Sequence, residues 1–396
     1  MIRLRNVFPV FIVSSLILAG CGDDGDELPD VVSSTVLIYM AADNSMDSEV
    51  DYTLEQLKTG AKHSGGTVVV YLDRENETPR LFKLTPAGEE VLLKTYDEEN
   101  SASAVTLARV IGETKELEPA DQFGLVLWSH ALGWMPAGYS NTTRSTTLKA
   151  ERSFPRTRYI CTDDTPADGT LYTGMMEITD LADKIPDGTA EFILFDVCLM
   201  GSVEALYELR HTCDYMIASP TEVLAEADWD ASGMPYDEVL PLLFGGKDDL
   251  IKVCQKYDDH YHGMGSEILR SATVALVDAR GLDGLYNTAA SILEGKLTQA
   301  ASLDVSSLQV YHTPNVPQVF FDLGDVMEQL STEAGYGQFK EQLARTVIYK
   351  AATEQFVDVP IDPDHFSGLS MYVPLEKWKG NREYEYYFSL GWSSVY

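Results

Sequence analysis

Two side chains suited to acyl-transfer chemistry each follow a short apolar run. The run 123–129 leads into His130, and the run 191–197 leads into Cys198. Apolar runs of this length predict buried strands, and the carboxyl ends of parallel strands line the crevice where α/β proteins bind ligands. A thiol nucleophile needs a neighbouring base, and imidazole can accept its proton and return it to a leaving group. The sequence therefore predicts that His130 and Cys198 share one sheet edge.

Each residue alone also has a simpler explanation. Free cysteine is among the most buried residue types, so a single Cys at a strand end is usually a small core side chain. The occurrence of both residues at strand ends is what favours catalysis. Ser129 beside His130 does not indicate a serine hydrolase, because no G-x-S-x-G turn surrounds it.

The composition is that of a globular, acidic protein. Its 396 residues are 45% hydrophobic and 10% aromatic, which excludes a disordered polymer. Lysine and arginine number 29 against 62 aspartates and glutamates, giving a net charge of −33. Nucleic acids and anionic lipid surfaces bind basic patches, so neither is an expected partner. Basic substrates remain favoured.

The N-terminus predicts export. Arg3 and Arg5, the apolar run 7–18 and the small residues before Cys21 are typical of a secretory signal over residues 1–20. The sequence Leu-Ala-Gly-Cys resembles a bacterial lipobox, which implies a lipid anchor on Cys21 as the only membrane contact. The alternative is an ordinary soluble export signal that contains a cysteine.

An acidic tether, residues 21–33, follows the signal. It resembles signals that send some lipoproteins to the outer cell surface, so we expect an exported, lipid-anchored protein of the bacterial outer membrane that faces outward. Beyond the tether, Cys161, Cys213 and Cys254 accompany Cys198. No Cys-x-x-Cys spacing indicates zinc, and whether any of them forms a disulfide stays open.

The body, residues 34–396, alternates strand and helix patterns, which predicts an α/β fold with a mostly parallel sheet covered on both faces. The expected strands are 35–40, 67–72, 123–129, 191–197, 215–219, 272–277 and 368–373, with an antiparallel hairpin over 80–84 and 91–95. The expected helices are 46–62, 102–117, 178–185, 202–211, 247–262 and 281–297. We expect one domain with a C-terminal extension whose boundary has no clear sequence signal.

The two strand ends resemble the clostripain family of cysteine peptidases, which share a caspase-like fold. The resemblance rests on Leu-Trp-Ser-His at 127–130 and Phe-Asp-Val-Cys-Leu-Met-Gly at 195–201, supported by residues 39–44 and 217–220. It covers residues 35–222 with specific motifs and the C-terminal part more loosely. It implies a caspase-like three-layer α/β sandwich with a C-terminal extension.

The resemblance also implies a catalytic dyad, in which Cys198 attacks the scissile carbonyl and His130 transfers protons. The backbone amides of Cys198 and Ala131 are the expected oxyanion donors. The family usually has glycine after the histidine, whereas this chain has Ala131. Alanine keeps the amide but does not reach positive φ without strain. The alternative function is therefore a catalytically impaired surface lipoprotein that binds protein or peptide on the same scaffold.

By similarity to the family, Asp196 is the expected carboxylate for a basic P1 side chain, because a buried cation needs a counter-charge. A structural carboxylate that ties strand to loop is an equal alternative. Glu222 and Glu226 are further pocket candidates, and a solvated acidic loop is the alternative for each. The predicted enzyme is a cysteine endopeptidase that cuts polypeptides after Arg or Lys.

A basic cluster occupies the long irregular segment between the two catalytic residues. A peptidase that cuts after basic residues could process itself there, whereas a solvated loop is the alternative. The candidate sites are Arg144, Lys149, Arg152, Arg156 and Arg158.

No cofactor is required by any motif. Asp43 and Asp47 leave a Ca²⁺ site open, since some relatives use calcium, but their spacing is not that of an EF-hand. Asp258, His260 and His262 are too closely spaced to converge on a metal from a helix, and we interpret them as an exposed helix end.

Overall fold

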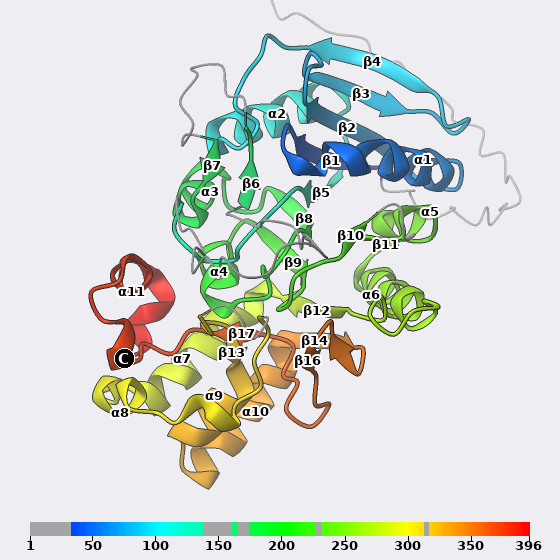
Figure 1. The fold of residues 1–396 in the computed structure, drawn as a ribbon. Coiled ribbons are helices and arrows are strands. Elements are labelled where there is room, and N and C mark those ends of the chain that lie inside the picture. The colour runs from blue at the N-terminus through cyan, green and yellow to red at the C-terminus, as the bar shows by residue number, and fades with distance from the viewer. Residues whose placement is uncertain (1–32, 138–159, 165–173, 227–230, 313–316) are drawn as a thin grey trace, which may run out of the picture. The chain divides into compact units, whose positions relative to one another are not determined.

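A nine-stranded sheet is the centre of the computed structural model, which describes residues 33–137, 160–164, 174–226, 231–312 and 317–396 (Figure 1). Its strands are β1 (Ser34–Ala42), β2 (Thr67–Arg74), β3 (Arg80–Leu84), β4 (Glu90–Thr95), β5 (Gln122–Trp128), β8 (Ala190–Asp196), β9 (Cys213–Ala218), β12 (Thr273–Asp278) and β14 (Val347–Ala352). Across the sheet their order is β14-β12-β9-β8-β5-β1-β2-β3-β4.

The middle of the sheet is parallel and its two sides are antiparallel. Strands β2, β1, β5, β8 and β9 pair in parallel, whereas β3 and β4 on one side and β12 and β14 on the other run antiparallel to their neighbours. Every residue of β1 is buried, as expected for a strand covered on both faces. The expected α/β class and the antiparallel hairpin are confirmed.

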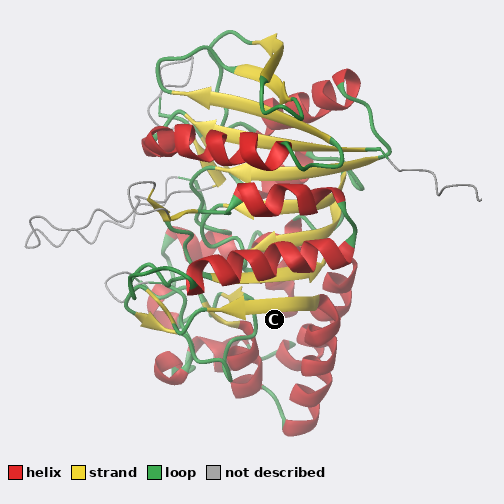
Figure 2. Ribbon diagram, turned by 90° about the vertical axis from the view of Figure 1, so that its right-hand side faces the viewer, coloured by secondary structure: helices red, strands yellow, loops and turns green. Residues whose placement is uncertain are grey.

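Helices cover both faces of the sheet (Figures 1 and 2). They are α1 (Val50–Ala61), α2 (Ala104–Leu117), α3 (Ile178–Lys184), α4 (Val203–Glu208), α5 (Tyr236–Val239), α6 (Lys247–His262), α7 (Leu282–Leu293), α8 (Leu297–Ala301), α9 (Leu323–Leu330), α10 (Glu333–Thr346) and α11 (Arg382–Tyr387). Helices α1, α5 and α6 pack together on one face, and α2, α3, α4 and α7 lie on the other. Within the described ranges, no helix has the length and apolar character needed to cross a membrane.

Short two-stranded sheets surround the main one. Their strands are β6 (Ile160–Thr162) with β7 (Met175–Met176), β10 (Ala225–Glu226) with β11 (Ala231–Ser232), β13 (Phe321–Asp322) with β17 (Ser370–Met371), and β15 (Gln355–Phe356) with β16 (Val359–Pro360). The expected helix over 46–62 is divided: a 3₁₀ turn, η1 (Ser45–Glu49), precedes α1.

One strand prediction is wrong. The segment 368–373 does not join the main sheet; only Ser370–Met371 is extended, and it pairs with β13. The edge position belongs to β14, which follows α10 directly and pairs with β12. Its residues are mostly half-buried, so β14 lacks the fully apolar run by which the central strands are recognised.

The turn that follows β8 packs directly against the turn that follows β9. The amide of Gly201 donates to the carbonyl of Ser219 at 2.7 Å. A Cβ on Gly201 would lie 2.5 Å from the nitrogen of Pro220, which is backbone and cannot rotate away. Only glycine allows this approach, three residues after Cys198.

We expect Gly201→Ala to lower the free energy of unfolding by about 1–3 kcal/mol, because the new methyl group must displace backbone. Gly112→Ala is the matched control: Gly112 is exposed in α2 with open space around its Cα, so alanine should stabilise the protein by about 0.5–1 kcal/mol. Urea unfolding followed by tryptophan fluorescence measures both. Equal midpoints for Gly201→Ala and the parent would contradict the close packing.

Candidate active site

The register between β5 and β8 sets the positions of the two predicted catalytic residues. Trp128 and Asp196 are paired at the ends of these parallel strands. His130 and Cys198 each stand two residues beyond that pair, so they leave the sheet side by side at its carboxyl edge. The structure thus brings together the two residues that the sequence selected.

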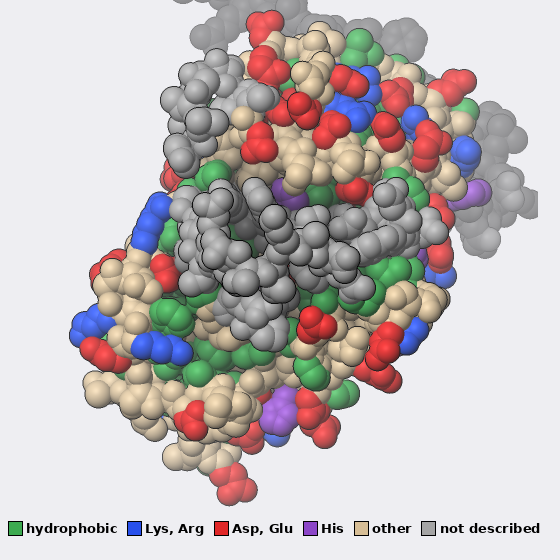
Figure 3. Space-filling view, in the orientation of Figure 1, with side chains coloured by type: hydrophobic (Ala, Val, Ile, Leu, Met, Phe, Trp, Pro, Cys, Tyr) green, Lys and Arg blue, Asp and Glu red, His purple; other side chains and the backbone are tan. Residues whose placement is uncertain are grey.

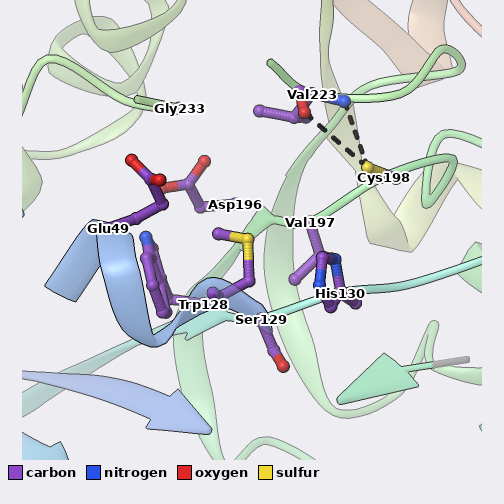
Figure 4. Close-up of a pocket in the computed structure, with 10 residues that line it drawn as sticks. Glu49, Trp128, Ser129, His130, Asp196, Val197, Cys198, Val223 and Gly233 are labelled. Atoms are coloured by element: carbon purple, nitrogen blue, oxygen red, sulfur yellow. Dashed lines mark hydrogen bonds between the residues drawn. The ribbon is translucent and has the colours of Figure 1, made fainter. Parts of the chain in front are cut away.

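His130 and Cys198 line one pocket. Its walls are formed by Met46, Glu49, Trp128, Ser129, His130, Asp196, Val197, Cys198, Val223 and Gly233. Figure 4 shows the imidazole and the thiol on one side of this pocket, with the carboxylates of Asp196 and Glu49 on the other. Both catalytic candidates are deeply set, each being only 4% exposed.

The imidazole of His130 is held at one nitrogen. Its Nε2 lies 2.8 Å from the hydroxyl of Ser45, the first residue of η1. Burial lowers the pKa of His130 to about 4, because a desolvated imidazolium is disfavoured. The ring is therefore neutral near pH 7 and able to accept a proton.

The sulfur of Cys198 contacts the loop after β9. The amide of Val223 donates to Sγ at 3.3 Å. Burial raises the pKa of Cys198 well above its usual range, and the negative charge of Glu222 raises it further. The resting pair is consequently a neutral thiol and a neutral imidazole, so the thiolate must form as the reaction proceeds.

The turn after His130 contains a left-handed backbone position, and Ala131 does not occupy it. Ala131 is not at positive φ; the left-handed position is Gly133, at φ 58°, where a Cβ would lie 2.5 Å from the carbonyl oxygen of Leu199. Alanine at position 131 therefore introduces no strain. Among the described residues, the backbone amides of Ala131 and Cys198 donate no hydrogen bond, which leaves both available to an oxyanion.

Asp196 is a buried carboxylate that lines the pocket. Its Oδ2 accepts hydrogen bonds from the Tyr236 hydroxyl at 2.7 Å and from the Met234 amide at 3.4 Å, and Oδ1 takes part in neither. Burial raises its pKa to about 6. Gly233 faces this carboxylate, and a Cβ there would lie 2.5 Å from Oδ1. The missing side chain lets the carboxylate pack directly against the backbone of Gly233.

The turn η1 contributes to the site although no sequence motif indicated it. Ser45, Met46 and Glu49 come from this turn, and Met46 and Glu49 line the pocket. The turn follows β1, whose carboxyl end lies beside that of β5. The reasoning applied to the ends of β5 and β8 would have identified these residues if it had been applied to β1 as well.

Of the two other acidic candidates, Glu222 is the one whose side chain the structure describes. Glu222 does not line the pocket with Asp196; its Oε1 lies 3.5 Å from Nε2 of His312, and both side chains are buried. Glu226 belongs to β10, and its side chain lies outside the described part of the structure. Cys21, with residues 1–32, and the processing candidates Arg144, Lys149, Arg152, Arg156 and Arg158 also lie outside it.

The described cysteines are all free and buried. No group of three or more His, Cys, Asp or Glu side chains in the described ranges is arranged to hold a metal ion. Of the two calcium candidates, Asp47 forms an ion pair with Arg74 at 2.8 Å and Asp43 is buried. His262 pairs with Asp258 at the exposed end of α6. Ser129 donates its hydroxyl to the carbonyl of Ala41.

This chain is similar to known cysteine peptidases. The family model described as the clostripain family, Peptidase_C11, matches residues 38–388. Clostripain of Hathewaya histolytica is 21% identical over 434 residues, which cover 90% of this chain and 76% of that protein.

Two solved structures share the fold over nearly their whole length. An inactive zymogen C11 protease from Parabacteroides distasonis is 31% identical, with a TM-score of 0.75 over 93% of this chain and 99% of that one. A secreted C11 cysteine protease from Bacteroides thetaiotaomicron, in complex with an irreversible peptide inhibitor, is 26% identical, with a TM-score of 0.71 over 92% and 98%. The fold is therefore the caspase-like one expected. The chain belongs to the clostripain family and is a cysteine-type endopeptidase.

Proposed function

We propose that this enzyme hydrolyses peptide bonds after Arg or Lys through a dyad of Cys198 and His130. The observation that carries the proposal is the single pocket that contains the thiol, the imidazole and two carboxylates. In such a pocket the thiol and the imidazole carry out the reaction, and the two carboxylates provide the counter-charge for a basic P1 side chain.

The proposed reaction proceeds in two stages. His130 takes the thiol proton as Sγ attacks the scissile carbonyl carbon, and the amides of Cys198 and Ala131 donate to the oxygen that becomes negative. His130 then gives the proton to the leaving amine, and a thioester forms. Water, deprotonated by His130, attacks the thioester, and the thiol is released with its proton restored.

The pocket favours a cation over an apolar side chain. Asp196 and Glu49 are both carboxylates, respectively 4% and 8% exposed, and a buried carboxylate is strongly stabilised by a paired cation. The acidic surface adds long-range attraction, since Figure 3 shows Asp and Glu side chains spread over the visible face with fewer Lys and Arg. Asp196 retains its structural hydrogen bonds in this role, because they use only Oδ2.

The competing proposal, a catalytically impaired binding protein, depended on strain at Ala131. The backbone of Ala131 is not in the left-handed region, so the strain on which the competing proposal depended is absent. We therefore favour the enzyme.

Self-processing within Arg144–Arg158 is part of the proposal. Segments before and after that stretch are bonded beside the active site: the Cys161 amide donates to the His130 carbonyl at 2.8 Å, and Asn44 Nδ2 donates to the Thr162 carbonyl at 2.8 Å. A cut would therefore leave two chains associated. The similar Parabacteroides distasonis protein is described as an inactive zymogen, which agrees with activation of this kind.

We further propose that the protein is exported and anchored by a lipid on Cys21, in the outer membrane and facing outward. The N-terminal sequence supports this, as does similarity to a secreted Bacteroides thetaiotaomicron protease. Polypeptides with exposed basic residues are then the natural substrate class. Calcium binding at Asp43 stays a proposal, and activity measured with increasing concentrations of a calcium chelator would test it.

The dyad and the P1 pocket can be separated kinetically. We expect Cys198→Ala to abolish cleavage and His130→Ala to lower kcat about 10²–10⁴-fold. Asp196→Asn should lower kcat/KM for Arg and Lys substrates about 100-fold, because it removes the charge but keeps an acceptor for Tyr236. A fluorogenic panel varied at P1 measures all three. Equal losses on basic and uncharged P1 substrates would assign Asp196 a purely structural role.

The pH profile of kcat/KM should identify Asp196. Its pKa is raised to about 6, so below that pH the carboxyl is neutral and binds a cation poorly. We expect kcat/KM for an Arg substrate to rise with pH through about 6, while His130, with its pKa near 4, stays neutral throughout. Asp196→Asn should remove this rise.

The raised pKa of Asp196 makes the folded protein less stable as the pH rises, whereas the same rise in pH makes the enzyme more active. Because the folded protein holds the Asp196 proton up to about pH 6 and the unfolded chain releases it near 4, stability from this residue falls as pH rises between these values. Unfolding midpoints of the parent and Asp196→Asn at pH 4.5 and 7 test the sign. A parent that gains stability relative to Asp196→Asn over this interval would contradict the shift.

Self-processing predicts two chains from the active protein and one from Cys198→Ala. On denaturing electrophoresis the parent should separate into two bands, whereas size exclusion should give a single peak of unchanged volume, because β6 remains bonded to the N-terminal chain. N-terminal sequencing of the second band should begin after one of the five basic candidates. A single band from the fully active parent would refute processing.

A further inference from the structure

Among the described residues, Ser45 is the one whose side chain hydrogen-bonds the ring of His130. It lies 2.8 Å from Nε2, across a sequence separation of 85 residues. An imidazole has two nitrogens, and a neutral ring carries a proton on only one. Whatever occupies Nε2 therefore decides which nitrogen is free to act on the thiol.

We propose that Ser45 is a positioning residue that accepts a hydrogen bond from Nε2–H of His130 and so leaves Nδ1 as the basic nitrogen that takes the proton of Cys198. The proposal rests on the proposed role of His130 as the proton carrier. It replaces a simple dyad by a chain of three groups, in which a hydroxyl takes the orienting role that a carboxylate has in other triads.

The position of the hydroxyl is fixed by η1. Asn44 caps this turn: its Oδ1 accepts from the Met46 amide at 2.8 Å, and its Nδ2 donates to the carbonyls of Ala41 and Thr162. Further along the same turn, Asp47 forms an ion pair with Arg74 of β2. The serine thus sits on a turn tied to β1, β2 and β6, which holds its backbone beside the ring and keeps Oγ within reach of Nε2.

A hydroxyl can accept from Nε2–H in both charge states of the ring. Once His130 has taken the thiol proton, Nε2–H still donates to Oγ, so the contact persists in the charged state and is strengthened there. The other ionisable groups around the ring are the Cys198 thiol and the pocket carboxylates of Glu49 and Asp196. Burial accounts for the lowered pKa of His130, so these carboxylates do not hold the resting ring in its protonated form.

Kinetics of three variants test the proposal. Ser45 is exposed, so Ser45→Ala should fold normally. We expect it to lower kcat about 10- to 100-fold with KM nearly unchanged, because an orienting hydrogen bond to a charged ring is lost. Ser45→Thr retains the hydroxyl and should recover kcat to within about threefold. Ser302→Ala, an exposed serine bonded only to helix carbonyls of α8, should behave as the parent.

The tautomer gives a readout that does not depend on turnover. In the Cys198→Ala background, long-range ¹H–¹⁵N correlation spectra should show His130 protonated at Nε2, with Ser45→Ala shifting the ring toward a mixture of tautomers. Unchanged tautomer and unchanged kcat in Ser45→Ala would overturn the proposal while leaving the dyad intact. Full activity of His130→Ala would instead remove the proposed function, and the role of Ser45 with it.

Discussion

The parallel register of β5 and β8 is the constraint on which the active site depends. Because Trp128 pairs with Asp196, the residues two positions later leave the sheet at one height and on one side. A shift of one residue would turn Cys198 toward the opposite face and separate it from His130. Packing supports this register: Gly124 is paired with Phe192, whose ring lies 2.4 Å from where a Cβ of residue 124 would be, so a slipped pairing would drive that ring into a larger side chain.

Desolvation then determines the electrostatics of the pocket. The same burial that fixes the strands raises the pKa of the Cys198 thiol and lowers that of the His130 imidazole, so the resting site carries no charge on either group. Charge separates only when substrate fills the pocket and the oxyanion amides have a partner. Asp196 follows the same logic, because a bound cation favours its ionised form and lowers a pKa that burial had raised. Substrate therefore completes the electrostatic balance of the site.

The sequence was sufficient to predict the strands that are buried on both faces. It was insufficient to predict contacts between residues that are far apart in the chain. The central strands have continuous apolar runs, and β5 and β8 led directly to His130 and Cys198. Strand β14 was missed because its residues are mostly half-buried. Ser45 was missed because its contact with His130 depends on the shape of a 3₁₀ turn. Glu222 was a candidate for the pocket, with a solvated loop as the alternative; its buried carboxylate instead lies beside His312, which no local pattern indicates.

The C-terminal part is joined to both catalytic turns. The ring of Trp134, four residues after His130, packs against the rings of Tyr372 and Tyr387 with centroids 4.9 and 5.7 Å apart. After Cys198, the carbonyl of Gly201 accepts from the Ser370 amide at 2.8 Å. The expected extension is thus part of the core that holds the active site. Its sequence carries no boundary because the described residues from Ser33 to Tyr396 fold as one unit, and a break there would detach the supports of His130 and Cys198 together.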